Sequence, residues 1–132
     1  KEKGLRKILN FGHTFAHAYE ATMGFSKKLN HGEAVILGTI SALKFSLNEK
    51  LINFTEYQSI VKHIYKLSLP SNIKKYFSIK NLDIILSFMQ KDKKNTSTQI
   101  NLILLKKIGF AVFNKQYNIL EIKKFLKKEL TN

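Results

Sequence analysis

The chain has 132 residues, 44% of them hydrophobic, and its 23 Lys and Arg against 9 Asp and Glu give a formal net charge of +14. This length is one domain or part of one, and the hydrophobic share excludes a disordered tail. The absence of cysteine excludes disulfides and thiolate zinc sites. No apolar run approaches the roughly 20 residues of a membrane span. Because no signal peptide opens the chain and no disulfide can form, we expect a cytoplasmic protein.

Apolar residues recur at helical spacing in six segments. In chain order these are residues 4–23, 31–49, 53–67, 71–77, 80–91 and 118–129. Gly24 ends the first helix and a polar loop over 24–30 follows it, whereas Pro70 closes the third segment. Residues 99–106 are expected to form a strand, with a possible partner at 110–113. The sequence therefore predicts a mainly α domain with a small β hairpin.

Polar side chains gather on one face of the first predicted helix. At about 100° per residue, six of them fall within a sector of roughly 80°. This polar stripe consists of Glu2, Arg6, Asn10, His13, His17 and Glu20. The remaining positions of the helix are largely apolar, so we expect the stripe to line a site rather than to face bulk solvent.

Two histidines of the polar stripe have the spacing of metal ligands. His13 and His17 are four residues apart, so their rings can converge on one ion, or one can bind a metal and the other a substrate. The loop that follows can fold His31 back against them. Two histidines and a carboxylate from elsewhere would leave zinc an open position for substrate. The alternative is that these are ordinary core or surface histidines.

Cations and amides close to these histidines suit an anionic ligand. Arg6 can clamp a carboxylate or phosphate, although a salt bridge to Glu2 would also explain it. Asn10 can hydrogen-bond a hydroxyl group. Lys93 and Lys94 stand in a loop before the predicted strand and can act as point charges, although a solvated charge run is the common alternative.

The strong positive charge admits two partner classes. Nucleic acid is one, but Arg6 is the only arginine, and base contacts usually recruit arginine. A small phosphorylated and carboxylated substrate is the other. The chain also starts at Lys1, with no lead-in to a helix whose stripe already includes Glu2, so we expect a C-terminal piece of a longer protein.

Four segments carry a resemblance to a known family. They are Arg6-Lys-Ile-Leu-Asn10-Phe-Gly-His13-Thr-Phe-Ala-His17-Ala-Tyr-Glu20, His31-Gly-Glu33-Ala-Val, Met89-Gln-Lys-Asp92-Lys93-Lys94 and Leu-Ile-Leu-Leu-Lys-Lys-Ile-Gly109. Their order and spacing resemble 3-dehydroquinate synthase, within the superfamily that also holds metal-dependent alcohol dehydrogenases. The resemblance covers essentially this whole chain, and it implies that residues 1–132 are a helical C-terminal domain lacking the N-terminal NAD-binding domain. Ala16 departs from the family's frequent glycine, a change expected only to tighten helix packing.

The resemblance also implies roles for individual residues. His13 and His31 match the family's two histidine ligands of a divalent metal, zinc or cobalt, whose third ligand is a glutamate of the N-terminal domain. His17 matches a histidine that contacts substrate and handles protons, and Glu2 matches a carboxylate close to the metal. The substrate-binding positions are matched by Arg6, Asn10, His17 and Lys93 or Lys94.

The reaction implied by the resemblance is the conversion of 3-deoxy-D-arabino-heptulosonate 7-phosphate to 3-dehydroquinate and phosphate, a lyase step of the shikimate pathway that leads to chorismate and the aromatic amino acids. It needs bound NAD and the metal. The chain alone is expected to be inactive, and the whole enzyme to be a homodimer. Alternatives are another sugar-phosphate cyclase, a metal-dependent polyol dehydrogenase, or a basic nucleic-acid-binding module.

Overall fold

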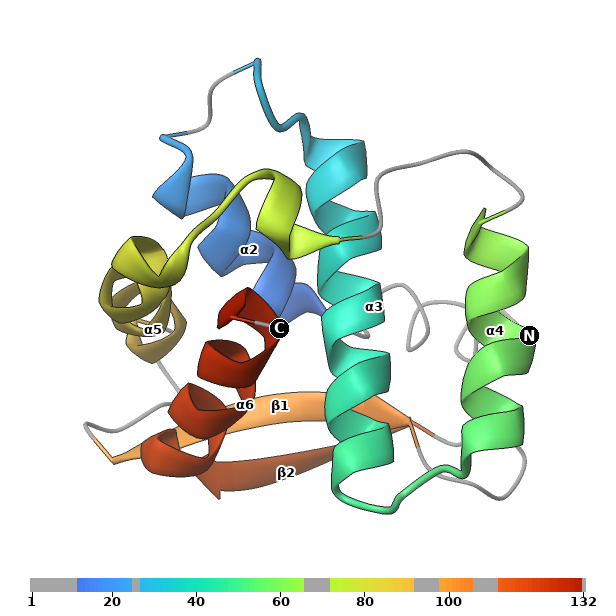
Figure 1. The fold of residues 1–132 in the computed structure, drawn as a ribbon. Helices are drawn as coiled ribbons and strands as arrows, with labels where there is room; N and C mark the ends of the chain where they lie inside the picture. Colours follow the sequence, from blue (N-terminus) through green and yellow to red (C-terminus); the bar gives the residue numbers. More distant parts are fainter. Residues whose placement is uncertain (1–11, 25–26, 66–71, 92–97, 106–111, 132) are drawn as a thin grey trace.

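The computed structural model describes residues 12–24, 27–65, 72–91, 98–105 and 112–131. The elements are α2 (His13–Thr22), α3 (His31–Asn48), α4 (Phe54–Tyr65), η1 (Ile73–Lys75), η2 (Ile79–Asn81), α5 (Leu82–Gln90), β1 (Gln99–Leu105), β2 (Val112–Asn118) and α6 (Ile119–Thr131). In Figure 1 the long helix α3 separates α4 from α2, α5 and α6, and the hairpin lies across one end. The predicted mainly α fold with a small hairpin is confirmed.

An aromatic cluster joins the helices to the hairpin. Phe45 of α3 has its ring centroid 4.9 Å from that of Tyr117 on β2, 5.2 Å from Phe125 on α6 and 6.5 Å from Phe15 on α2. The first two pairs meet edge to face, a favoured geometry for aromatic rings. All four rings are buried, so this cluster fixes where α2 begins relative to α3.

Helices α2 and α3 cross at a point lined by residues with little or no side chain. A Cβ atom added to Gly38 of α3 would lie 2.6 Å from the Cβ of Ala16 and 2.6 Å from the carbonyl oxygen of Gly12. A Cβ at Gly12 would lie 2.5 Å from the oxygen of Gly38. The two backbones therefore approach this closely only because glycine stands at both positions.

The start of α3 is fixed by a capping box. The Asn30 side chain accepts a hydrogen bond from the amide of Glu33, and the Glu33 carboxylate accepts one from the amide of Asn30, at 2.8 Å and 3.0 Å. This pattern satisfies two amides that a helix start otherwise leaves without partners. His31 follows the cap directly, so the start predicted at this residue is confirmed.

The single helix predicted over residues 4–23 is wrong. Gly12 has φ of 81°, a left-handed conformation, and caps α2, which begins at His13. A continuous helix cannot pass through a residue in this conformation. The polar stripe therefore cannot be extended by helical geometry from His13 back to Glu2, Arg6 and Asn10, which lie outside the described residues.

Other elements differ in their boundaries from the predicted ones. Strand β2 runs over 112–118 instead of 110–113, and it pairs antiparallel with β1 from Leu105–Val112 to Gln99–Asn118. The helix predicted over 71–77 is reduced to the single turn η1, and α5 is preceded by η2. Helix α6 starts one residue late because Asn118 belongs to the strand. Among the described residues no helix is both long and apolar enough to cross a membrane.

Candidate metal and substrate site

Helix α2 presents two histidines on its exposed side. The rings of His13 and His17 are stacked, with centroids 6.0 Å apart and planes at 28°. Both side chains are exposed, whereas Phe15 and Tyr19 between and beyond them are buried in the core. The four-residue spacing thus brings both rings to one face, as the sequence predicted.

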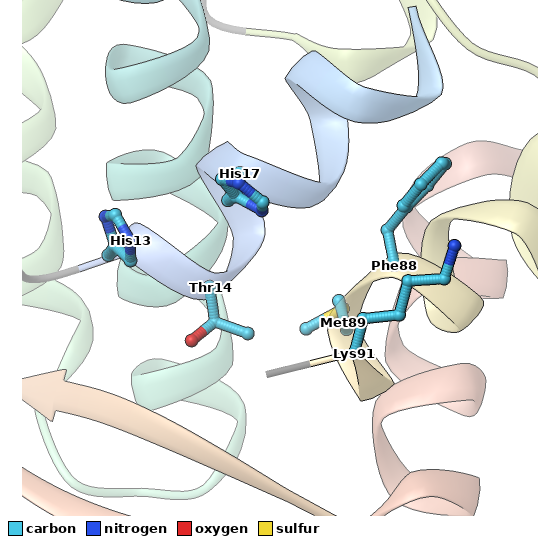
Figure 2. A pocket seen from close by; sticks show the side chains of 6 residues that line it. All are labelled: His13, Thr14, His17, Phe88, Met89 and Lys91. Carbon is cyan, nitrogen blue, oxygen red and sulfur yellow. The ribbon is translucent and has the colours of Figure 1, made fainter. Parts of the chain in front are cut away.

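A cavity of about 170 Å³ opens beside these rings. It is lined by His13, Thr14, His17, Phe88, Met89 and Lys91, which we call the Lys91 cavity. Figure 2 shows that its walls come from α2 on one side and from α5 and the residue after it on the other. The Lys91 ammonium lies 4.6 Å from the centre of the Phe88 ring, a cation–π contact that holds a positive charge at this wall.

His31 lines a second, smaller cavity together with His13 and His17. Its volume is about 50 Å³, and its lining is Gly12, His13, Ala16, His17, Glu20, His31 and Val35, which we call the His31 cavity. His31 enters it from the start of α3, whereas the other two histidines come from α2. The structure therefore brings together His13, His17 and His31, as expected from a loop that folds His31 back against the first helix.

Glu20 connects the two helices at this cavity. Its Oε1 lies 3.0 Å from Nδ1 of His31. The His31 side chain is 76% exposed, whereas that of Glu20 is 15% exposed. The carboxylate is thus held at the edge of the core while the imidazole extends over the cavity.

Glu33, two residues after His31, serves the backbone. Its Oε1 accepts the amide of Asn30 in the capping box, and its Oε2 accepts a long hydrogen bond of 3.5 Å from the hydroxyl of Tyr76. Burial first, and then the nearby Glu33 carboxylate, raise the pKa of Tyr76 above its usual 10.0. Glu33 therefore contributes to the site by fixing where His31 starts α3.

Several predicted site residues lie outside the described residues. They are Glu2, Arg6, Asn10, Lys93 and Lys94. Their assigned roles in substrate binding and catalysis stay predictions.

Sequence reasoning missed three parts of this site. Lys91 lies in the motif Met89-Gln-Lys-Asp92-Lys93-Lys94, from which the resemblance implies a substrate-binding role for Lys93 or Lys94 but none for Lys91. Phe88 and Thr14 also line the Lys91 cavity; Thr14 donates a hydrogen bond of 3.3 Å to the carbonyl of Asn101 and so ties α2 to β1.

The donor atoms fit a divalent metal in part. Imidazoles from two helices line the His31 cavity, and imidazole is a preferred ligand of zinc and similar metals. Among the described residues no group of three His, Asp or Glu side chains is arranged to hold an ion. A complete site would therefore need a ligand from elsewhere, and catalytic zinc sites have three protein ligands.

Comparison with known proteins places the chain in a family. Residues 1–95 match the family described as 3-dehydroquinate synthase C-terminal. The chain is 60% identical over 99% of its length to 3-dehydroquinate synthase of Pelagibacter ubique (strain HTCC1062), covering 36% of that protein. It is 40% identical over 96% of its length to the synthase of Coxiella burnetii (strain Dugway 5J108-111), covering 34% of that protein.

Solved structures agree on the fold. A 2-deoxy-scyllo-inosose synthase complexed with carbaglucose-6-phosphate, NAD+ and Co2+ is similar with a TM-score of 0.65 at 22% identity, over 90% of this chain and 32% of that one. The chain spans about a third of the length of the relatives that it matches. It belongs to the 3-dehydroquinate synthase family and corresponds to that family's C-terminal region.

Proposed function

We propose that this chain is the metal- and substrate-binding domain of a 3-dehydroquinate synthase, which converts 3-deoxy-D-arabino-heptulosonate 7-phosphate to 3-dehydroquinate and phosphate. The observation that carries the proposal is the convergence of His13, His17 and His31 on one cavity in a chain 60% identical to a protein of that name. Relatives at 60% and 40% identity share this name, which favours the synthase over a polyol dehydrogenase or a nucleic-acid-binding module.

In this proposal His13 and His31 hold a divalent metal, zinc or cobalt. Support comes from their imidazoles, which line the same cavity from two helices, and from the Co2+ in the similar cyclase structure. A bound divalent metal would polarise the substrate alcohol that NAD oxidises. The third ligand and NAD would come from the part of the enzyme that the relatives have beyond this region.

The remaining residues would handle the substrate. His17 lies one helical turn from His13 and is exposed to both cavities, which suits a group that exchanges protons with bound substrate. Lys91 offers a positive charge at the opposite wall for a phosphate or carboxylate. Arg6, Asn10, Lys93 and Lys94 are proposed to bind the anionic groups, and Glu2 to act close to the metal. The net charge of +14 would draw such a substrate toward the site.

The proposal extends to the surroundings of the domain. Residues 1–132 would need an NAD-binding domain for activity, so we expect the chain alone to be inactive. A homodimer of the complete enzyme in the cytoplasm is part of the same proposal.

A chimeric enzyme tests this function. The chain is joined to the N-terminal two-thirds of the Pelagibacter synthase, and phosphate release from the heptulosonate phosphate is measured with NAD and Co2+ present. We expect turnover, lost at least 100-fold with His13→Ala or His31→Ala and unchanged with Lys62→Ala on the exposed side of α4. A folded chimera that binds metal without releasing phosphate, or one indifferent to both histidines, would show that the proposed activity is wrong.

A further inference from the structure

The contact between Glu20 and His31 restrains the His31 side chain, whose rotamer is not fixed by packing. The imidazole of His31 is 76% exposed, so the core does not fix its rotamer. Its Nδ1 nevertheless lies 3.0 Å from Oε1 of Glu20, a carboxylate that is only 15% exposed. An isolated surface pair of this kind stabilises a fold very little. Its effect is therefore on the orientation of the ring.

The backbones on both sides of this contact are held in place. Glu20 follows the fully buried Tyr19 on α2, and His31 lies between Asn30 and Glu33, the two residues of the capping box of α3. The close crossing at Gly12 and Gly38 fixes the two helices relative to one another. The distance between Glu20 and His31 is thus set by the fold, in contrast to a contact between two flexible surface side chains.

The contact also selects one protonation form of the neutral ring. An ionised carboxylate only accepts hydrogen bonds, so the proton of neutral His31 stands on Nδ1 and points at Glu20. The lone pair then belongs to Nε2, which is the nitrogen left for a metal. Metal-binding histidines typically donate their second nitrogen to a carboxylate in this way, and loss of that partner costs about 10- to 100-fold in metal affinity.

We propose that Glu20 is a positioning residue, which holds His31 as the Nδ1–H tautomer and presents Nε2 as a metal ligand at the cavity shared with His13. This inference rests on the proposed metal-binding role of His31. It assigns to Glu20 a role that differs from those of the other polar-stripe residues. Glu20 acts through His31 and does not itself touch the substrate or the metal.

Two measurements on the 132-residue chain test the proposal. Long-range proton–nitrogen NMR on the metal-free, 15N-labelled chain at pH 8 reports the tautomer of each histidine, and His31→Ala identifies the His31 signals. Calorimetric titration with Co2+ alone reports the affinity. The variant is Glu20→Ala, which removes the acceptor at a helical position where alanine is favourable. Glu121→Ala is the control, since it removes an equal charge from an exposed position at the start of α6.

We expect His31 to be the Nδ1–H tautomer in the unaltered chain and in Glu121→Ala, and to shift toward Nε2–H in Glu20→Ala. Cobalt affinity should fall about 10- to 100-fold in Glu20→Ala and stay unchanged in Glu121→Ala. An unchanged tautomer, or unchanged cobalt affinity, in a Glu20→Ala chain with native circular dichroism overturns the positioning role. If cobalt binds equally with and without His31→Ala, in the chain or in the chimera that supplies the third ligand, the metal site itself is wrong and the positioning role is lost with it.

Discussion

Replacing Gly38 with alanine should separate the two helices that carry the histidines. The added Cβ would lie 2.6 Å from the Cβ and amide nitrogen of Ala16 and from the carbonyl oxygen of Gly12. Two of these three atoms belong to the backbone, so no side-chain rotation relieves the contact. Helix α3 must therefore move away from α2.

The size of the effect follows from two opposing contributions. Overpacking of a core costs typically about 1–3 kcal/mol, and contact with rigid backbone belongs at the upper end of that range. Alanine in a helix interior recovers about 1 kcal/mol relative to glycine. The free energy of unfolding should thus fall by about 2 kcal/mol. With about 2.1 cal/mol/K of unfolding entropy per residue, a chain of 132 residues loses about 7 °C in Tm.

Thermal unfolding followed by circular dichroism measures this loss. Gly32→Ala is the matched control in the same helix, because the nearest atom to its added Cβ is the Asn30 side-chain oxygen at an ordinary 3.5 Å. Gly32→Ala should raise Tm slightly through helix propensity. The cobalt affinity of Gly38→Ala should fall along with its Tm. Equal Tm values for Gly38→Ala and the unaltered chain would refute the close crossing of α2 and α3.

Other substitutions probe the core and the cap. Tyr19→Phe removes a buried 2.6 Å hydrogen bond to Ser41 and should lower the free energy of unfolding, measured in urea, by about 1–2 kcal/mol. The double variant Tyr19→Phe/Ser41→Ala should recover part of this loss, because it also removes the Ser41 hydroxyl that is left without its partner. Asn30→Ala breaks the capping box and should cost about 1 kcal/mol and weaken cobalt binding, whereas Asn30→Asp should preserve both. Burial raises the pKa of Tyr117 to about 12, above the 10.0 of an unfolded tyrosine. The free energy of unfolding should therefore be constant below pH 10 and decrease as the pH rises toward 12. Thermal melts from pH 8 to 11 measure the first part of this decrease. The buried Tyr117 hydroxyl has no hydrogen-bond partner within the described residues. Tyr117→Phe should therefore be at least as stable as the unaltered chain at pH 7, and its Tm should fall less between pH 7 and pH 11. A decrease of more than about 1 kcal/mol in its free energy of unfolding at pH 7 would contradict this.

Local signals explain how much of the fold the sequence predicted. The start of α3 carries its own capping residues, Asn30 and Glu33, and its apolar spacing continues to the end of the helix. Strand β1 alternates buried Ile100, Leu102 and Leu104 with less buried residues, which is the period of a half-buried strand. These elements were predicted to within one or two residues because their patterns need no distant partner.

The elements that were misjudged depend on distant contacts or on one backbone angle. Strand β2 extends to Asn118 because it pairs with β1 along its whole length, a partner that its own sequence does not indicate. Gly12 interrupts the first helix because its backbone is left-handed, and the nearby carbonyl of Gly38 leaves room there for glycine alone. Apolar periodicity runs through this glycine unchanged, so spacing alone predicted a longer helix.

The site shows the same division between local and distant information. The spacing of His13 and His17 was sufficient to place both rings on one face of α2. Their convergence with His31 requires the crossing of α2 and α3, and the role of Glu20 requires the distance between the two helices. Sequence reasoning placed Glu20 on the polar stripe, but it had no means of pairing it with His31.

The two proposed metal ligands share a structural position that explains how the site is held. His13 is the first residue of α2 after Gly12, and His31 is the first residue of α3 after Asn30. Side chains at such helix starts are exposed, so their positions depend on the caps and on the helix crossing more than on core packing. Substitutions at Gly38, Asn30 or Glu20 should therefore lower cobalt affinity by more than the decrease in the free energy of unfolding alone would explain. Tyr19→Phe, in contrast, should lower the free energy of unfolding and leave cobalt affinity unchanged. Comparing both quantities across these four variants separates a site held by helix starts from one held by the core, because a core-held site would lose affinity in proportion to stability.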